Sequence, residues 1–137
     1  MIKVVMGLKG NGKTKTLIAN VNESVKEERG DVVCIEKDSK LRYDVSHKVR
    51  LISASEYDIN SFDKFYGFIC GLIAGNYDIT AVYVDSILKI CGENMEEFYN
   101  FLKKIEVLTA NIKFYMTASY DFDAAPENIR EYIQCHE

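Results

Sequence analysis

The sequence predicts an α/β fold, a three-layer α/β/α sandwich around a mostly parallel, roughly five-stranded sheet. Strand-like and helix-like segments alternate along the chain, and the connections between them are short. A glycine-rich loop at residues 7–14 also follows the first apolar run directly. Parallel strands need a crossover between them, so this alternation favours a sheet that is covered on both faces.

Five short apolar runs predict the strands of this sheet. They are residues 2–6, 31–36, 49–52, 80–85 and 112–118. The run at 80–85, Thr-Ala-Val-Tyr-Val-Asp, is the most strand-like of them. Each of the others is followed by a segment with helical or turn character, as a parallel sheet requires.

The helices are predicted from apolar residues that recur at helical spacing. They are 13–29, 59–75, a segment opened by Asn94 after the strand at 80–85, and a final helix near Pro126. Gly30 is well placed to end the first helix. Asn94 is a favourable N-cap for the third, and Pro126 suits a first turn because its missing N–H needs no partner there.

Length and composition predict a single domain over residues 1–137. A chain of this length with 47% hydrophobic residues can bury one core and hardly two. The first strand begins at residue 2 without a leader pattern, and the most apolar stretch, Phe65 to Tyr77, is too short to span a bilayer. The four cysteines lack C-x-x-C spacing, which indicates reduced thiols. We therefore expect a cytoplasmic protein with no membrane span.

The charge balance argues against nucleic acid as a partner. The net charge is −4 and the pI is about 5.3, so long-range attraction to a polyanion is absent. One local exception is the basic segment from Lys37 to Arg50. We interpret it as a solvated, mobile loop, with a partner-binding or phosphate-binding patch as the alternative.

A complete G-x-x-x-x-G-K-[ST] motif carries the main functional prediction. It reads Gly7, Leu8, Lys9, Gly10, Asn11, Gly12, Lys13, Thr14, and Lys15 and Thr16 extend the predicted nucleotide-binding segment. Gly7 and Gly12 permit backbone angles that let successive N–H groups turn toward phosphate oxygens. Lys13 adds a point charge near the β- and γ-phosphates, and the Thr14 hydroxyl is a ligand for Mg²⁺.

Asp85 is the second candidate metal residue, beside Thr14. It ends the strand Ala81-Val82-Tyr83-Val84, and that strand end is expected at the same edge of the sheet as the loop. Mg²⁺ keeps most of its water and needs only one or two carboxylate partners. A loop or helix cap that begins at Asp85 is the plainer interpretation of the same pattern.

Together, residues 7–14 and 81–85 resemble the Walker A and Walker B motifs of the P-loop nucleoside triphosphatases. The resemblance implies ATP or GTP with Mg²⁺, bound at the carboxyl edge of a parallel sheet. No Asn-Lys-x-Asp motif is present late in the chain, so ATP is favoured over GTP. The chain is also similar to small bacterial P-loop proteins loosely labelled twitching-motility ATPase-like, but that motor's other domain has no counterpart in the sequence.

Similarity to the RecA-like branch adds Glu36 as a candidate catalytic residue next to Lys13. Members of this branch can carry a catalytic glutamate at the end of the strand that follows the first helix, where Glu36 stands. An ordinary strand end is the alternative.

Related ATPases often keep a polar γ-phosphate sensor at the end of a later strand, which points to Thr117 or Ser119, although either hydroxyl also suits a loop cap. Ser86, not glutamate, follows Asp85, which argues against vigorous hydrolysis.

Three functions therefore compete. The first is a Mg-dependent ATP-binding protein with weak or partner-stimulated ATPase activity. The second is a nucleoside-kinase-like phosphotransferase, for which the only candidate acceptor walls are the aromatic helix at 62–68 and the loop at 37–47. The third is a nucleotide-gated interaction module without significant turnover. The expected ligand is a nucleoside triphosphate, and a protein partner or a homo-oligomer stays open.

Overall fold

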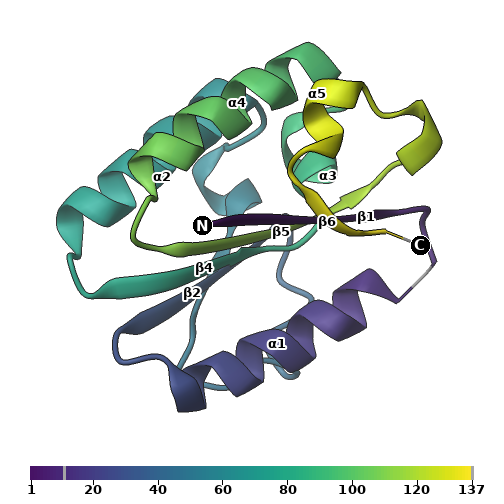
Figure 1. Ribbon diagram of the computed structural model, residues 1–137. Helices are drawn as coiled ribbons and strands as arrows, with labels where there is room; N and C mark the ends of the chain where they lie inside the picture. The colour runs from purple at the N-terminus through teal and green to yellow at the C-terminus, as the bar shows by residue number, and fades with distance from the viewer. Residues whose placement is uncertain (11, 137) are drawn as a thin grey trace.

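The computed structural model describes residues 1–10 and 12–136 and contains a six-stranded sheet (Figure 1). Its strands are β1 (Ile2–Gly7), β2 (Asp31–Glu36), β3 (Arg50–Ser53), β4 (Ile79–Val84), β5 (Lys113–Ser119) and β6 (Ile133–His136). The strand order is β3-β2-β4-β5-β1-β6, and every neighbouring pair is parallel. Because all strands run the same way, their carboxyl ends meet at one edge.

The helices cover the two faces of this sheet, which confirms the predicted three-layer α/β/α sandwich. They are α1 (Lys13–Glu27), α2 (Phe62–Gly75), α3 (Ile87–Cys91), α4 (Met95–Leu108) and α5 (Glu127–Arg130), with short 3₁₀ turns η1 (Ala54–Tyr57) and η2 (Phe122–Ala124). Figure 1 shows α1 on one face, and α2, α3, α4 and α5 on the other. No helix in the described ranges is long and apolar enough to cross a membrane.

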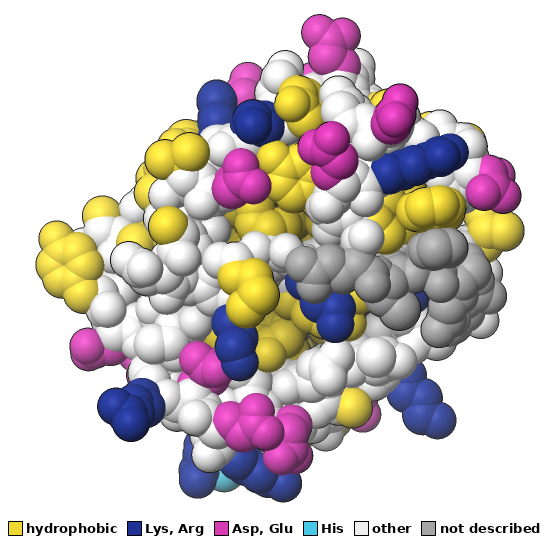
Figure 2. All heavy atoms as spheres, viewed as in Figure 1, with side chains coloured by type: hydrophobic (Ala, Val, Ile, Leu, Met, Phe, Trp, Pro, Cys, Tyr) yellow, Lys and Arg dark blue, Asp and Glu magenta, His cyan; other side chains and the backbone are white. Residues whose placement is uncertain are grey.

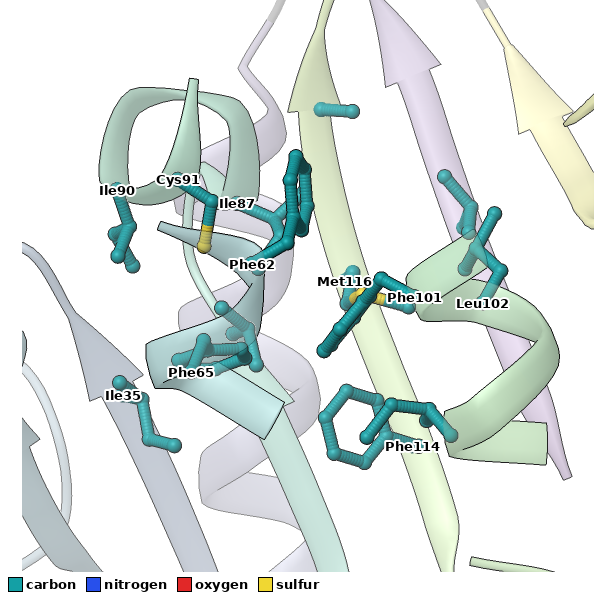
Figure 3. Packing of buried hydrophobic residues seen from close by; sticks show 14 of the residues in the cluster. Ile35, Phe62, Phe65, Ile87, Ile90, Cys91, Phe101, Leu102, Phe114 and Met116 are labelled. Atoms are coloured by element: carbon teal, nitrogen blue, oxygen red, sulfur yellow. The ribbon is translucent and has the colours of Figure 1, made fainter. Parts of the chain in front are cut away.

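The larger hydrophobic cluster lies between the sheet and α2, α3 and α4 (Figure 3). Phe62 of α2 stacks on Phe98 of α4 with 5.5 Å between ring centroids. Phe65 and Phe101 pack at 5.6 Å in a tilted arrangement. These aromatic contacts hold α2 against α4 and seal that face of the sheet.

The opposite face is covered by α1 together with part of the basic segment. Leu17 and Val21 of α1 are fully buried, and they belong to the same cluster as Leu41, Val45 and Val49. The prediction of a solvated loop at 37–50 is therefore wrong for its apolar residues, which pack against the helix. Its cationic side chains remain exposed to solvent.

The predicted sheet lacks one strand that the structure contains. Residues 133–136 form β6 beside β1, and the N–H of Val4 donates to the carbonyl of Tyr132 over 3.2 Å. The final helix predicted at Pro126 is only the single turn of α5, with Pro126 as its N-cap. The second helix begins at Phe62 and not at Ile59, because the Ser61 hydroxyl caps it by accepting from the N–H of Lys64.

Charged groups of both signs are spread over the face seen in Figure 2, with small hydrophobic areas between them. This mixture accords with the modest net charge of −4.

The free thiols of Cys34 and Cys91 are buried, and burial raises the pKa of each to about 12. A thiol with so high a pKa stays protonated and unreactive at neutral pH.

Candidate functional site

The glycine-rich loop joins β1 to α1 at the carboxyl edge of the sheet. Gly10 has φ 94° and Gly12 has φ 77°, both in the left-handed region that favours glycine. We predicted Gly7 and Gly12 for this role, but Gly7 is still part of β1, paired with Ser119 of β5. Asn11 lies outside the described residues. The left-handed positions are thus inside the loop and at the N-cap of α1.

Lys13 opens α1 and turns its side chain back over the loop. Its ammonium donates a hydrogen bond to the carbonyl oxygen of Leu8 over 2.8 Å, and the residue is buried. The 15-residue helix behind it directs the positive end of its dipole toward the loop. The loop therefore has a cation and a helix N-terminus facing the same region, the arrangement that favours an anion.

Thr14 and Asp85 meet beside Lys13 although they lie far apart in the sequence. The Thr14 hydroxyl donates to Oδ1 of Asp85 over 2.9 Å. Asp85 follows β4, and its own N–H donates to the carbonyl of Ile35 in β2 over 2.9 Å. The backbone bond to β2 holds the aspartate at the edge, so its carboxylate faces the first turn of α1.

Thr117 of β5 lies between the two motifs, since β5 separates β1 from β4 in the sheet. Its hydroxyl donates to Oδ1 of Asp85 over 3.3 Å and accepts from the N–H of Ser86 over 2.7 Å. Thr117 is almost completely buried. Of the two hydroxyl residues proposed for β5, Thr117 therefore contacts the aspartate, whereas Ser119 lines the cleft described next.

A cleft of about 600 Å³ opens at this edge. The loop and the first turn of α1 form one wall, the chain from Asp85 to Glu93 forms a second, and Ser119 at the end of β5 also lines the cleft. Its lining residues are Leu8, Lys9, Gly10, Lys13, Thr14, Asp85, Ser86, Leu88, Lys89, Glu93 and Ser119. The sequence-predicted loop and aspartate thus share one cavity.

Glu36 ends β2 but does not belong to the residues that line this cleft. Its Oε1 accepts the N–H of Lys40 over 2.9 Å, and its Oε2 accepts the N–H of Leu41 over 3.1 Å. Burial raises the pKa of this carboxyl above its usual range, the two N–H donors oppose that rise, and nearby Asp85 adds to it. In this structure the Glu36 carboxylate holds the segment that follows β2 in place through these two hydrogen bonds.

The wall after Asp85 contains features that we did not predict. Ser86 adopts a left-handed conformation with φ 59° and ψ 61°, which is uncommon for a residue with a Cβ. It precedes the short helix α3, which also escaped prediction. The sequence contains an indirect signal for this helix, an apolar run in which Lys89 is the one polar residue. The apolar residues are Ile87, Leu88, Ile90 and Cys91.

The oxygen atoms at this edge fit a magnesium ion better than a metal that needs a protein cage. No group of three His, Cys, Asp or Glu side chains is arranged to hold a metal within the described ranges. Thr14 and Asp85 instead offer one hydroxyl and one carboxylate 2.9 Å apart, beside a cleft large enough for further oxygen ligands. Mg²⁺ in phosphate-binding sites takes few protein ligands and completes its shell with water and phosphate oxygens.

Comparison with known proteins supports the fold. No family model and no curated protein matches the sequence. The structure is similar to the crystal structure of the flagellar accessory protein FlaH from Methanocaldococcus jannaschii, with a TM-score of 0.61 and 13% sequence identity. The match covers 94% of this chain but 64% of the FlaH chain, so this chain spans less than two thirds of FlaH. The α/β fold is thereby shown, and it is consistent with that of a P-loop nucleoside triphosphatase.

Proposed function

We propose that this protein binds ATP with Mg²⁺ in the cleft between the loop at 7–14 and Asp85, and hydrolyses it weakly or under stimulation by a partner. The observation that carries the proposal is the 2.9 Å contact between the Thr14 hydroxyl and Asp85 Oδ1. It joins the end of a phosphate-binding motif to a strand-end carboxylate at one sheet edge. A glycine-rich turn that binds no ligand would not require a carboxylate beside Thr14.

Different residues of the cleft would bind the phosphates and the Mg²⁺ ion. Loop N–H groups and the N-terminus of α1 attract the phosphates, and Lys13 supplies a positive charge once its ammonium exchanges the Leu8 carbonyl for a phosphate oxygen. The Thr14 hydroxyl and the Asp85 carboxylate are the groups that would hold Mg²⁺, directly or through water. The metal would neutralise phosphate charge, and Thr117 fixes the carboxylate that faces it.

Slow turnover agrees with the arrangement around Glu36. A general base must come within hydrogen-bond reach of the attacking water, directly or through one further water. Both oxygens of Glu36 already accept backbone N–H groups, and the residue does not line the cleft. Ser86, which follows Asp85, has no basic group. Efficient hydrolysis would therefore require the segment after Glu36 to move.

The phosphotransferase alternative receives less support. Its two candidate walls were the aromatic helix at 62–68 and the loop at 37–47, and neither contributes a residue to the cleft lining. Phe62 and Phe65 are buried in the core. The nucleotide-gated module remains the second candidate, because Glu36 connects the edge of the sheet to the basic segment.

Titration with ATP and GTP, each with and without Mg²⁺, tests the proposal through nucleotide-dependent thermal stabilisation. We expect MgATP to stabilise the protein more than MgGTP, and Lys13→Ala to abolish the effect. Thr14→Ser, which keeps a hydroxyl, is the matched control and should retain most of it. Equal stabilisation of wild type and Lys13→Ala by MgATP would overturn the proposal.

Product analysis then separates the candidate functions. Labelled ATP incubated with wild-type protein should release ADP and phosphate slowly in the absence of an acceptor. Transfer of label to an added nucleoside would favour the phosphotransferase. Tight binding without any release would favour the nucleotide-gated module.

A further inference from the structure

Lys89 is the one residue of α3 that is not buried. Ile87, Leu88, Ile90 and Cys91 of this five-residue helix are all buried in the core. Their packing against the sheet fixes the orientation of the helix, as Figure 3 shows for Ile87, Ile90 and Cys91. Lys89 is left on the solvent side, where it lines the same cleft as Lys13 and Thr14.

The start of α3 places Lys89 in the wall of the cleft that follows Asp85. Ser86 turns the chain immediately after Asp85 through its left-handed backbone, and its N–H is fixed by the Thr117 hydroxyl at 2.7 Å. The same hydroxyl donates to Asp85. Lys89 is therefore connected to the predicted metal residue through a short and firmly hydrogen-bonded piece of backbone, and its position does not depend on a mobile loop.

The ammonium of Lys89 has no partner among the residues that the structure describes. Within the described ranges its side chain makes no hydrogen bond, ion pair or ring contact. The cleft lining also contains the carboxyl groups of Asp85 and Glu93, which would repel a polyanion. A free cation on this wall offsets that repulsion where the phosphate chain would extend past Lys13 toward Asp85.

We propose that Lys89 is a second phosphate-binding cation, which contacts the terminal phosphate of a nucleoside triphosphate and so distinguishes it from the diphosphate. The assignment rests on the proposed nucleotide site. In that site the loop N–H groups would hold phosphates common to both nucleotides and Lys13 would lie near the β- and γ-phosphates, whereas Lys89 would contact only the terminal phosphate, from the wall after Asp85. Lys89 then sets the preference for triphosphate without touching the base or the sugar.

The test measures affinities for MgATP and MgADP in wild type, Lys89→Met and Lys89→Arg. Loss of an ammonium–phosphate contact at an accessible site should weaken MgATP about fivefold to tenfold and MgADP by less than about twofold. Lys89→Arg keeps the charge and should recover most of the difference. The effect of Lys89→Met should also shrink as salt is raised, because exposed charges are screened.

Lys26→Met is the matched charge control. Lys26 is a helical lysine in the last turn of α1, roughly 20 Å along the helix from Lys13. Its replacement by methionine should leave the affinities for MgATP and MgADP unchanged. Thermal unfolding without nucleotide checks that each variant is folded. If wild type binds both nucleotides and Lys89→Met has the same ratio of MgATP affinity to MgADP affinity, this assignment alone is overturned. If wild type binds neither nucleotide, the proposed function is overturned and this assignment with it.

Discussion

The Thr14 hydroxyl and Asp85 Oδ1 lie 2.9 Å apart across a sequence separation of 71 residues. The contact exists because β1 and β4 run parallel and end at the same edge, with β5 between them. Thr117 of that intervening strand completes the arrangement by donating to the same oxygen. The geometry makes the carboxylate charge of Asp85 the most direct target for an experiment on metal dependence.

Asp85→Asn should remove the benefit of Mg²⁺ for ATP binding and leave the fold intact. The asparagine carbonyl still accepts from Thr14 and Thr117, but the negative charge that attracts the cation is gone. We expect the Mg²⁺-dependent gain in ATP affinity to fall about 10- to 100-fold, the usual range for outer-shell metal partners. Calorimetric titration with and without Mg²⁺ measures this gain.

Asp63→Asn supplies the control for that experiment. Asp63 is exposed in the first turn of α2 and does not line the cleft, so its loss should leave the Mg²⁺ dependence unchanged. An Asp85→Asn protein with wild-type dependence on Mg²⁺ would show that the contact with Thr14 is a structural hydrogen bond only.

Much of this site was predictable because it lies at strand ends. The apolar runs predicted β1 and β4, and parallel strands place their following residues at one edge, so Thr14 and Asp85 were expected to be neighbours. Thr117 was one of two hydroxyl candidates, and only its hydrogen bonds with Asp85 and Ser86 in the folded chain distinguish it from Ser119.

Other features depend on tertiary contacts that a local pattern does not encode. The strand β6 is only four residues long and forms because β1 offers it an edge, so its sequence alone predicts little. The bonds from Lys40 and Leu41 to Glu36 require the chain to turn back over the end of β2. Burial of Leu41 and Val45 against α1 likewise reverses the expectation drawn from the basic composition of this segment.

Glu36→Gln should loosen the segment after β2 while ATP binding persists, and it should slow any hydrolysis in which the Glu36 carboxylate acts as general base once that segment has moved. The N–H groups of Lys40 and Leu41 bond to different carboxylate oxygens of Glu36, so in glutamine one of these two N–H groups would face the amide NH₂, which is a donor and cannot accept it. We expect faster tryptic cleavage after exposed Lys37, Lys40 or Arg42. The rate of cleavage in the absence of nucleotide is the measurement.

Glu97→Gln is the matched control for this change, because Glu97 is exposed on α4 and remote from the basic segment. Its cleavage rate should equal that of wild type. Unchanged cleavage in Glu36→Gln would mean that packing of Leu41 and Val45 holds the segment without the carboxylate. Unchanged hydrolysis in that variant would remove Glu36 from the candidate catalytic residues.

Two glycine-to-alanine substitutions should have opposite effects on stability. A Cβ added at Gly10 or at Gly71 meets nothing within 4 Å, so steric crowding by other residues does not decide either case. Gly10 has φ 94°, and alanine there is strained by about 1–2 kcal/mol. Gly71 lies inside α2, where alanine is favoured by about 0.5–1 kcal/mol.

Urea denaturation without nucleotide measures both free energies of unfolding. We expect Gly71→Ala to unfold at a higher urea concentration than wild type and Gly10→Ala at a lower one. Equal stability of wild type and Gly10→Ala would indicate that the loop relaxes to another conformation when nucleotide is absent.

The ion pair between Glu28 and Lys113 predicts a pH-dependent contribution to stability. The two groups lie 2.9 Å apart and connect the end of α1 to the start of β5, and the hydrogen bond from Lys113 holds the pKa of Glu28 below its ordinary value of 4.5. Because the folded state binds this proton less tightly than the unfolded state, the contribution is full at neutral pH. It is lost as the pH falls through 4.5 toward the lowered pKa of the folded protein.

Glu28→Gln should therefore lower the Tm at pH 7, and the difference from wild type should shrink steadily below pH 4.5. Thermal unfolding followed by circular dichroism at several pH values measures it. Glu23→Gln is the comparison, because its pair with Lys26 spans 3.7 Å between largely exposed side chains and contributes little. A Glu28→Gln difference that is constant from pH 7 to pH 3 would assign the effect to packing of the side chain and not to its charge.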